Sequence, residues 1–384
     1  MAKIAVIGKY PPLEGGIAAK TYWLANALSE RGHTIHMITE KLDADECHTI
    51  KQTGPIPCHE NIFIHRPEEV VPWHIPDDRQ RSISLLNRLL EVLEVEKPDL
   101  IEANYLVPYG VIAYLAGRIT GIPYVLRHGG SDIRKFLEGG IWPGIWRRAL
   151  AEALLIITDA GSERIVRKWS DRVVCLAPYM PAPSFFRPMH QKRNGHRALA
   201  LIGKANYYWE RKGWRHVIDM WPHLSEEFDL LVVSQGVGLE SFRSYAEPRL
   251  GGRATWENFV PPWGMPDLLN SVDGVFCYEE ELPFPVFSNL ALEALCCGIT
   301  VFTDKTDMVQ HFSAHGIDLR EHEKRIVTLP AREPVKAADT LSDYFSMKHE
   351  PLDSIAPELY GHYISSNEKA LLEAVKEPKN LETA

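Results

Sequence analysis

Short apolar runs and longer amphipathic segments alternate along the chain. The first run, 4–7, has the unbroken apolar character of a buried parallel strand, and the prolines at 11 and 12 end it because proline has no N–H for the ladder. The segment 18–30 carries apolar residues near a 3.6-residue period, and a second apolar run covers 34–39. The N-terminus is therefore predicted to be a β-α-β unit.

The same alternation continues through the rest of the chain. It predicts strands at 99–102, 124–126, 154–158, 172–176, 198–202, 229–233, 274–277 and 300–302, and helices at 109–118, 213–223, 266–271, 290–297 and 354–375. Strands that alternate with helices are typical of a doubly wound parallel α/β sheet. Between 180 and 196 three prolines, a glycine and several charges interrupt the pattern, which indicates a linker.

We therefore predict two Rossmann-like α/β domains of similar size. The first spans 1–182, the linker 183–196, the second domain 197–352, and a helical segment at 353–384 crosses back. Ligands of open parallel sheets bind at the carboxyl ends of the strands, so the chemistry is expected in a cleft between the two domains.

Composition narrows the possible partners. The chain has 384 residues, 45% of them hydrophobic, and a net charge of −9, which argues against a nucleic-acid partner because phosphate backbones require a basic face. Its six cysteines lack the spacings of metal or disulfide frameworks, so reduced thiols in a cytoplasmic protein are expected. No apolar run approaches membrane-spanning length.

Gly15 and Gly16 are the first candidate site residues. They remove side-chain bulk just before a predicted helix, whose free N–H groups attract anions. A phosphate or a carboxylate is the expected ligand of this loop.

Four sequence blocks occur in an order that resembles the retaining glycosyltransferases of the GT-B fold, family 4. They are KYPPLEGGI followed by LANALSERGHTIHMIT, RHGGSDI at 127–133, ENFVPPWGMPDLLNSVDGVF at 257–276, and FSNLALEALCCGITVFTD at 287–304. The resemblance covers about residues 1–305. It implies transfer of a hexose-type sugar from a nucleotide diphosphate sugar to an acceptor hydroxyl, which is a glycan, a lipid-linked acceptor or a small molecule.

The last block implies a donor site. Glu293 matches the family glutamate that binds the ribose hydroxyls, while the N–H groups of Ser288, Asn289 and Leu290 would meet the diphosphate. From the residues alone, an amphipathic helix capped by Asn289 is the alternative.

The family's second glutamate, eight positions before Glu293, is replaced by Pro285. Glu281, in an acidic run at 279–281, is the candidate to hold the transferred sugar, and a solvated acidic turn is the alternative. This departure leaves the choice of donor open.

Cations near the diphosphate would stabilise the departing phosphate. Lys212 matches the family lysine, and Lys204 stands where the family has an arginine. Lysine lacks the bidentate fork of arginine, so Arg211 is a candidate replacement, and solvated loop lysines are the alternative.

His128 matches the histidine that contacts the sugar near its reacting carbon, with Asp132 orienting it or capping the next helix. A purely structural histidine is the alternative. Gly15 and Gly16 would then meet the donor phosphate or the acceptor.

A pair of aspartates and an apolar stripe each allow a functional and a simpler interpretation. Asp43 and Asp45 have the spacing of metal-binding carboxylates in another glycosyltransferase fold, but we interpret them as surface charge and expect no metal and no cofactor besides the donor substrate. An apolar stripe at 141–150, beside Arg147 and Arg148, is predicted either to pack on the core of the first domain or to contact the inner face of a membrane.

Two other functions remain open. A nucleotide-sugar 2-epimerase of the same fold would need an additional acid and base, and it would act on the donor without an acceptor. A non-catalytic nucleotide-sugar binding subunit is suggested by Pro285 and Lys204, and it would bind the donor without turnover. The oligomeric state is not indicated by the sequence.

Overall fold

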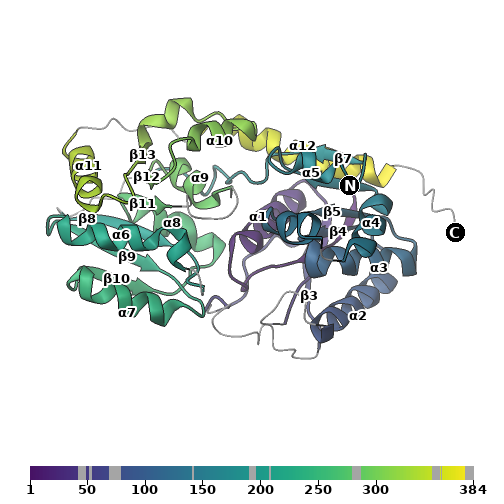
Figure 1. The fold of residues 1–384 in the computed structure, drawn as a ribbon. Helices are drawn as coiled ribbons and strands as arrows, with labels where there is room; N and C mark the ends of the chain where they lie inside the picture. Colours follow the sequence, from purple (N-terminus) through teal and green to yellow (C-terminus); the bar gives the residue numbers. More distant parts are fainter. Residues whose placement is uncertain are drawn as a thin grey trace. The chain divides into compact units, whose positions relative to one another are not determined.

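The computed structural model describes residues 1–41, 49–51, 54–68, 79–140, 142–189, 196–206, 209–278, 287–347, 355 and 357–376. The chain divides into two compact units (Figure 1). Unit 1 comprises Met1–Tyr179 and Gly361–Ala384, and unit 2 comprises Met180–Tyr360. The segment predicted as a linker thus falls within the range of unit 2, and the C-terminal segment joins unit 1 from Gly361.

Unit 1 contains a seven-stranded sheet in the described part of the chain, with the order β3-β2-β1-β4-β5-β6-β7. All the neighbouring strands pair in parallel. The strands are β1 (Lys3–Gly8), β2 (Thr34–Ile38), β3 (Ile62–His65), β4 (Leu100–Asn104), β5 (Tyr124–Arg127), β6 (Leu155–Thr158) and β7 (Val173–Cys175). The predicted β-α-β opening and doubly wound parallel sheet are confirmed.

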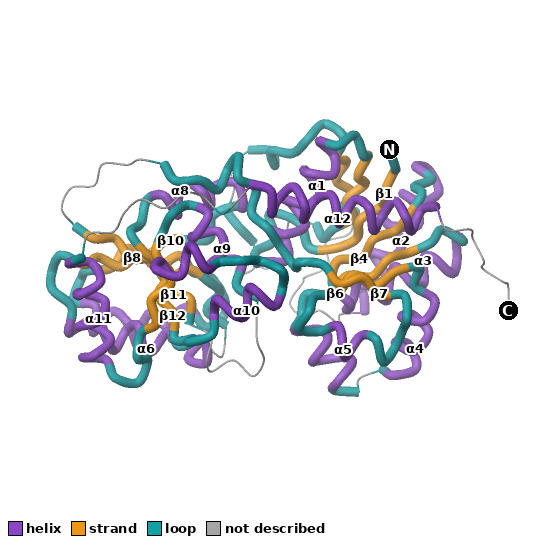
Figure 2. The backbone as a smooth tube through the Cα atoms, turned by 90° about the horizontal axis from the view of Figure 1, so that it is seen from above, coloured by secondary structure: helices purple, strands orange, loops and turns teal. Residues whose placement is uncertain are grey.

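Helices flank the sheet of unit 1 on both faces (Figure 2). They are α1 (Gly16–Glu30), α2 (Arg79–Glu96), α3 (Val111–Thr120), α4 (Pro143–Glu152), α5 (Glu163–Val166) and α12 (Pro357–Lys376). Helix α2 was missed by the sequence pattern, although Leu85, Leu89, Val92 and Leu93 bury one of its faces. The predicted helix 109–118 begins two residues later, at Val111, after a wide turn at Leu106–Gly110.

Unit 2 repeats this architecture with six parallel strands in its described part, in the order β10-β9-β8-β11-β12-β13. They are β8 (Arg197–Ile202), β9 (Phe228–Val233), β10 (Ala254–Glu257), β11 (Gly274–Cys277), β12 (Thr300–Thr303) and β13 (Ile326–Thr328). The helices are α6 (Trp214–Met220), α7 (Leu239–Leu250), α8 (Met265–Asn270), α9 (Asn289–Cys296), α10 (Met308–Ala314) and α11 (Pro334–Ser346). Helix α6 is shorter than predicted because the chain tightens into a 3-10 turn at Trp221–His223.

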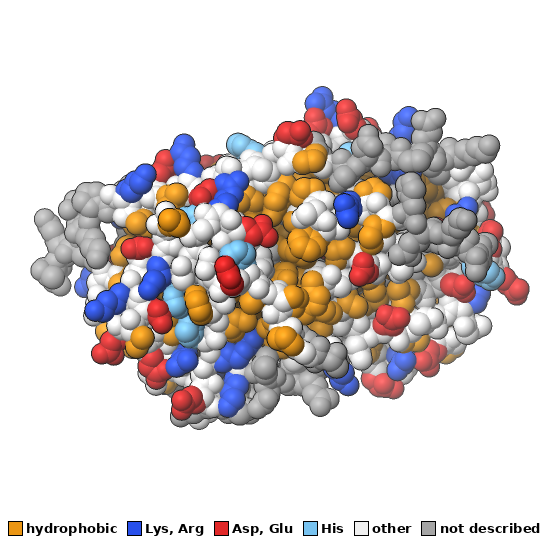
Figure 3. Space-filling model, turned by 180° about the vertical axis from the view of Figure 1, so that it is seen from behind, with side chains coloured by type: hydrophobic (Ala, Val, Ile, Leu, Met, Phe, Trp, Pro, Cys, Tyr) orange, Lys and Arg blue, Asp and Glu red, His pale blue; other side chains and the backbone are white. Residues whose placement is uncertain are grey.

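The surface agrees with the composition. On the face shown in Figure 3, acidic and basic side chains are interspersed, without a broad basic region. Cys58, Cys175, Cys277, Cys296 and Cys297, the cysteines within the described residues, are free thiols. None of the described helices combines the length and apolar character that crossing a membrane would require.

The C-terminal helix α12 is fixed to unit 1 by one carboxylate. Glu368 pairs with Arg31, and its Oε1 lies 3.0 Å from Nε2 of His33. Nδ1 of His33 accepts the Ala2 N–H at 3.2 Å, so the neutral ring carries its proton on Nε2 and donates it to Glu368. This cluster joins α12 to the N-terminal strand and to the turn after α1.

We predict that Glu368→Gln weakens the docking of α12 by about 1–2 kcal/mol, because hydrogen bonds to a carboxylate are stronger than those to an amide. The hydrogen bond from His33, followed by that from Arg31, lowers the pKa of the Glu368 carboxyl. A lowered pKa in the folded state stabilises above the ordinary glutamate value of 4.5, and that stabilisation is lost as the pH falls through the folded pKa.

Native-state hydrogen exchange of the α12 amides, measured at pH 7 and at a series of pH values below 4.5, tests both effects. The parent should lose protection progressively as the pH falls below 4.5, and Glu368→Gln should show reduced protection already at pH 7. Glu373→Gln is the matched control, because Glu373 makes an exposed pair with Lys369 at 3.7 Å on the same helix. Equal protection in the two variants would contradict the prediction.

Candidate functional site

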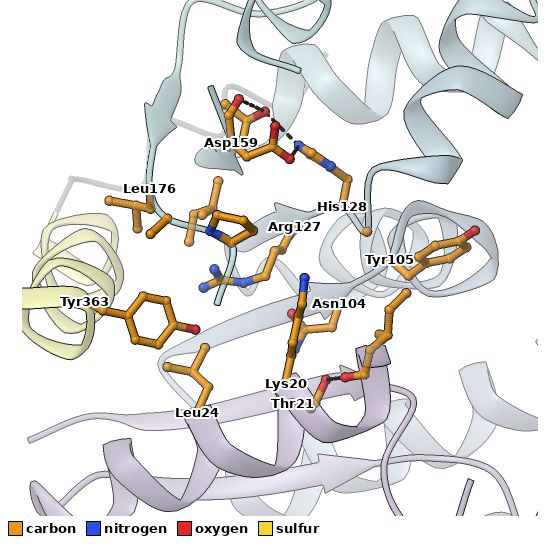
Figure 4. Close-up of a pocket in the computed structure, with 16 residues that line it drawn as sticks. Lys20, Thr21, Leu24, Asn104, Tyr105, Arg127, His128, Asp159, Leu176 and Tyr363 are labelled. Atoms are coloured by element: carbon orange, nitrogen blue, oxygen red, sulfur yellow. Dashed lines mark hydrogen bonds and ion pairs between the residues drawn. The ribbon is translucent and has the colours of Figure 1, made fainter. Parts of the chain in front are cut away.

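Unit 1 has a pocket at the carboxyl ends of its strands (Figure 4). The strand order reverses between β1 and β4, and such a switch point is where open α/β sheets place their ligands. The pocket is lined from α1, from the ends of β4, β5 and β6, from the segment after β7 and from α12. The lining residues are Ile17, Lys20, Thr21, Leu24, Asn104, Tyr105, Arg127, His128, Gly129, Ile157, Thr158, Asp159, Leu176, Ala177, Pro178 and Tyr363.

Asp132 holds the loops around this pocket together. Its carboxylate is fully buried and accepts the Leu106 N–H at 2.8 Å, the Gly129 N–H at 3.0 Å and the Ile133 N–H at 3.1 Å. Burial raises the pKa of this carboxyl, while His128 and the backbone donors act in the opposite direction. No hydrogen bond joins the Asp132 and His128 side chains. These contacts fix Asp132 to its own turn and to the loop after β4, and they show neither of the two predicted roles, because they include no bond to the His128 side chain and none to the second or third N–H of the following helix.

His128 lies at the rim of the pocket, but its side chain is only 2% exposed. Nδ1 accepts the Gly130 N–H at 3.1 Å, which leaves the proton of the neutral ring on Nε2. Nε2 then donates to Oγ1 of Thr158 at 2.7 Å, and Asp159 lies 3.9 Å away. Burial lowers the pKa of His128, so the ring is neutral at pH 7.

The glycines of the HGGSD block allow close packing around His128. A Cβ at Gly129 would lie 2.6 Å from Ile17 and 2.8 Å from the ring of Tyr105. Tyr105 itself has a φ of 95°, which is strained for a non-glycine residue, and its hydroxyl lies 3.1 Å from Oγ of Ser131. Strain of this kind is concentrated at functional sites.

The predicted glycine loop lies at the start of α1. Gly15 is the N-cap, with a φ of 109°, and its carbonyl accepts the Ala19 N–H at 3.1 Å. Both Gly15 and Gly16 are exposed, and no atom lies within 4 Å of a Cβ built at Gly15. The loop is therefore open on its outer side, as an anion site at a helix start requires.

In unit 2 the structure brings Lys204 and Lys212 together. Nζ of Lys212 donates to the backbone carbonyl of Lys204 at 2.7 Å and lies 5.3 Å from the centre of the Trp214 ring. An ammonium group has three donors, so this anchor is compatible with a phosphate contact. Arg211 is exposed on the same turn.

These lysines lie at the switch point of unit 2, between β8 and β11. Gly213, with a φ of 69°, begins α6 and packs on Tyr278 at the end of β11, where a Cβ would approach to 2.8 Å. Tight packing thus fixes the Lys212 turn against the β11 end of the sheet.

Helix α9 supplies the predicted donor-site residues Ser288, Asn289, Leu290 and Glu293. Its N-cap is Ser288, whose Oγ accepts the Ala291 N–H at 3.3 Å, so the alternative with Asn289 as the cap is wrong. Asn289 and Leu290 are the first two helical residues, whose N–H groups have no intrahelical partner. Glu293 is 5% exposed, which a merely solvated first-turn charge would not be.

Several predicted features lie outside the described residues, among them Glu281, Pro285, Asp43, Asp45 and Ile141.

The apolar stripe predicted at 141–150 has a buried part and an exposed part. Trp146, Ala149 and Leu150 belong to the core of unit 1, and Trp142 and Ile145 are 42% and 39% exposed. Among the described residues, no three His, Cys, Asp or Glu side chains are placed to hold a metal ion together.

Sequence reasoning missed several pocket residues, including Lys20, Asn104, Thr158, Asp159 and Tyr363. Asn104, Thr158 and Asp159 could have been found, because they lie at or directly after the carboxyl ends of strands. The carboxyl ends of parallel strands share one edge of the sheet, so residues there are neighbours of the site. For Tyr363 there was no comparable signal, because it lies on a helix far along the chain.

Comparisons with known proteins show what this chain resembles in sequence and in fold. Residues 15–185 match the family model described as Glycosyl transferase 4-like domain. Over 124 residues the chain is 29% identical to N-acetyl-alpha-D-glucosaminyl L-malate synthase of Bacillus anthracis, which covers 32% of this chain and 30% of that protein. The match thus spans less than a third of the curated relative's length.

Solved structures match over nearly the whole chain. Sucrose-phosphate synthase from Thermosynechococcus elongatus has a TM-score of 0.66 at 16% identity, with 97% of each chain covered. Anabaena Alr3699/HepE in complex with UDP and glucose has a TM-score of 0.61 at 12% identity, with 98% of this chain and 99% of that chain covered. At these identities the likeness establishes the GT-B fold.

We predict that Gly129→Ala destabilises unit 1 by about 1–3 kcal/mol, because the new methyl group would overpack against Ile17 and Tyr105. Thermal unfolding followed by near-UV circular dichroism measures the shift. Gly144→Ala is the matched control, since a Cβ there meets no atom within 4 Å at an exposed position of α4. Equal unfolding temperatures for the two variants would show that the HGGSD turn tolerates a side chain.

Proposed function

We propose that this chain is a GT-B glycosyltransferase of the family 4 type and that it transfers a hexose-type sugar from a nucleotide diphosphate sugar to an acceptor hydroxyl with retention of anomeric configuration. The observation that carries the proposal is the switch point of unit 2. There an anchored lysine and the start of α9 flank neighbouring strand ends.

Unit 2 binds the donor in this proposal. Lys212, held by the Lys204 carbonyl, and the first N–H groups of α9 stabilise the diphosphate. Glu293 accepts hydrogen bonds from the ribose hydroxyls, and its burial strengthens such bonds. Support comes from Anabaena Alr3699/HepE, a protein of similar fold that was crystallised with UDP and glucose.

Unit 1 contributes the acceptor side and the loop at Gly15 and Gly16. Both ring nitrogens of His128 already have partners, and its ring is neutral. We therefore assign His128 the role of positioning the HGGSD turn, with the sugar contact made by the exposed backbone of Gly129.

The reaction balances without a protein nucleophile. The bond between the anomeric carbon and the donor phosphate oxygen breaks, and the acceptor oxygen bonds to the same face of that carbon. The acceptor's proton passes to the departing phosphate oxygen. Lys212 stabilises the charge that develops on the diphosphate, which lowers the barrier.

Product analysis separates this function from the alternatives. With donor and a panel of hydroxyl acceptors, a transferase releases nucleoside diphosphate and forms a glycoside with the anomeric configuration of the donor, observed by proton NMR. A 2-epimerase would convert the donor without acceptor, and a binding subunit would release no nucleotide under any condition.

Peripheral membrane contact forms a second part of the proposal. Trp142 and Ile145 are exposed beside Arg147 and Arg148 on α4, a combination suited to an anionic lipid surface. Such a contact would bring the protein to a lipid-linked acceptor in the membrane.

We expect the protein to sediment with vesicles that contain phosphatidylglycerol and to stay in solution with neutral phosphatidylcholine vesicles. Replacing Trp142 and Ile145 together by serine should reduce the bound fraction several-fold, because their apolar area contributes to insertion. The control is the Ile119→Ser variant, whose side chain is 64% exposed on α3. Equal binding of both variants would rule out contact through α4.

Donor binding tests the unit 2 site directly. We expect a uridine or other nucleoside diphosphate sugar to raise the melting temperature of the parent protein. Lys212→Gln and Glu293→Gln should each weaken its apparent affinity about 10- to 100-fold, because each removes a charge-assisted hydrogen bond.

Lys336→Gln is the control, since Lys336 is an exposed residue of unit 2 that pairs with Glu333 at 3.4 Å. It should bind donor like the parent. If no nucleotide sugar stabilises the parent, or if the three variants respond alike, the donor-site assignment is wrong.

A further inference from the structure

Two stacked histidines join β3, the edge strand of the unit 1 sheet, to its neighbour β2 (Figure 1). The ring of His36 on β2 stacks on the rings of His65 and Phe63 on β3, with centroids 5.2 Å and 5.3 Å away. Nδ1 of His36 lies 3.0 Å from Nε2 of His65. Only one hydrogen fits between two ring nitrogens at this distance, so one ring donates and the other accepts. This hydrogen bond therefore requires that one of the two rings be neutral.

The charged groups that face the histidine pair come from β1 and α2. Oε2 of Glu96 lies 3.5 Å from Nε2 of His36 and 3.5 Å from Nζ of Lys3. Arg88 adds a positive charge on the side of the partner ring, and it pairs with Glu91 at 2.8 Å. These two cations and two carboxylates balance. Protons on both rings would therefore leave two adjacent positive charges with no further carboxylate to offset them.

Both rings are neutral at pH 7. Burial lowers the pKa of His65 to about 4, and the charges of His36 and Arg88 act in the same direction. Burial also lowers the pKa of His36, against the attraction of Glu96. In an opened strand both pKa values would return to the ordinary 6.5, so the closed strand binds fewer protons than the opened one. The stability of the closed strand is complete above pH 6.5 and is lost as the pH falls from 6.5 toward 4.

The residue directly after this strand, Arg66, connects β3 with the glycine loop. Its Nη2 donates to the Pro11 carbonyl at 3.0 Å, and its Nη1 donates to the Glu40 carbonyl. Residues 10–14 are all buried, and they lead directly into the exposed Gly15. One guanidinium group thus ties the end of β3 to the loops that follow β1 and β2.

Glu40, the second anchor of Arg66, is itself fixed in unit 1. Its carboxylate accepts hydrogen bonds from Arg81 and from the Tyr109 hydroxyl, and all three residues are buried. A displacement of β3 would therefore move Arg66 relative to a fixed Glu40 and withdraw it from the Pro11 carbonyl.

We propose that β3 is a pH-sensitive clamp on the glycine loop of unit 1. Acid charges both rings of the pair His36 and His65, breaks their hydrogen bond and releases β3 from β2. Arg66 moves with the strand and leaves the Pro11 carbonyl, which loosens the segment that positions the glycine loop. The clamp is a property of the unit 1 fold and does not rest on the proposed function.

Native-state hydrogen exchange of the full chain from about pH 7.5 to about pH 5, corrected for intrinsic exchange rates, tests this proposal. Opening of the β3 amides should rise up to about tenfold per pH unit below 6.5 for each proton taken up. The Leu13 N–H, bonded to the Tyr10 carbonyl at 3.1 Å, and the Ile50 N–H, bonded to the Pro12 carbonyl at 2.7 Å, should lose protection over the same range.

His65→Gln separates the histidine pair from other effects of acid. The glutamine amide can donate to His36 but takes up no proton, so the rise in β3 opening down to pH 5 should be roughly 10- to 30-fold smaller than in the parent. His223→Gln is the control, because it removes an exposed histidine of unit 2, and it should behave like the parent.

Three results would overturn the proposal. The first is β3 protection that does not change with pH, or that changes equally in the parent and in His65→Gln. The second is opening of β3 that leaves the Leu13 and Ile50 amides protected, which would exclude the connection through Arg66. The third needs no variant: a proton NMR titration of the parent in which His65 has the ordinary pKa of 6.5.

Discussion

One buried carboxylate holds together the loops on which the unit 1 site depends. Asp132 has no access to solvent, and it accepts N–H groups from the loop after β4 and from the turn after β5. Without it, the buried Leu106 and Ile133 N–H groups would lose their acceptor, at a cost of about 1–3 kcal/mol for each unsatisfied group, and the Gly129 N–H would lose its acceptor at an exposed position. The strained Tyr105, the tightly packed Gly129 and the buried ring of His128 all lie on the segments that Asp132 joins.

In unit 2, close backbone contacts hold the loops of the site in place. The loops after β8 and β9 cross so closely that a Cβ at Gly236 would lie 2.3 Å from the Ala205 carbonyl, and one at Gly238 would lie 2.1 Å from the Asn206 carbonyl. The Gly238 N–H donates to Ala205 at 2.9 Å, which closes this crossing. The Lys204 carbonyl is thereby held in place to anchor the Lys212 ammonium. In both units, chemistry-bearing residues stand on loops that the rigid ends of a parallel sheet position.

The fold of this chain is shared with many proteins, whereas its chemistry depends on individual side chains. Fold likeness extends over nearly the whole chain at low identity, and one fold supports many activities. Named side chains carry the argument for sugar transfer, above all Lys212 and Glu293. The structure also changes the expected part of His128: with its nitrogens bonded to Gly130 and Thr158, it shapes a turn more readily than it contacts a sugar.

The sequence by itself determined the alternation of strands and helices, since apolar runs and their periods record which residues are buried. It placed β11 at 274–277 without error and the start of α1 within two residues. It also predicted the turn at Gly213 and the start of α9, because glycine and helix-capping residues determine the local backbone geometry. Helix α2 was missed although its apolar spacing was present.

Tertiary structure decided which distant residues share a site. The pairing of Arg127 with Glu102 and the approach of Tyr363 to the pocket join residues 25 and more than 200 positions apart, which no local period records. It also decided that Asp132 satisfies Leu106 and that half of the 141–150 stripe is core. Burial and hydrogen bonding depend on the packed environment, and that environment exists only once the sheet has assembled.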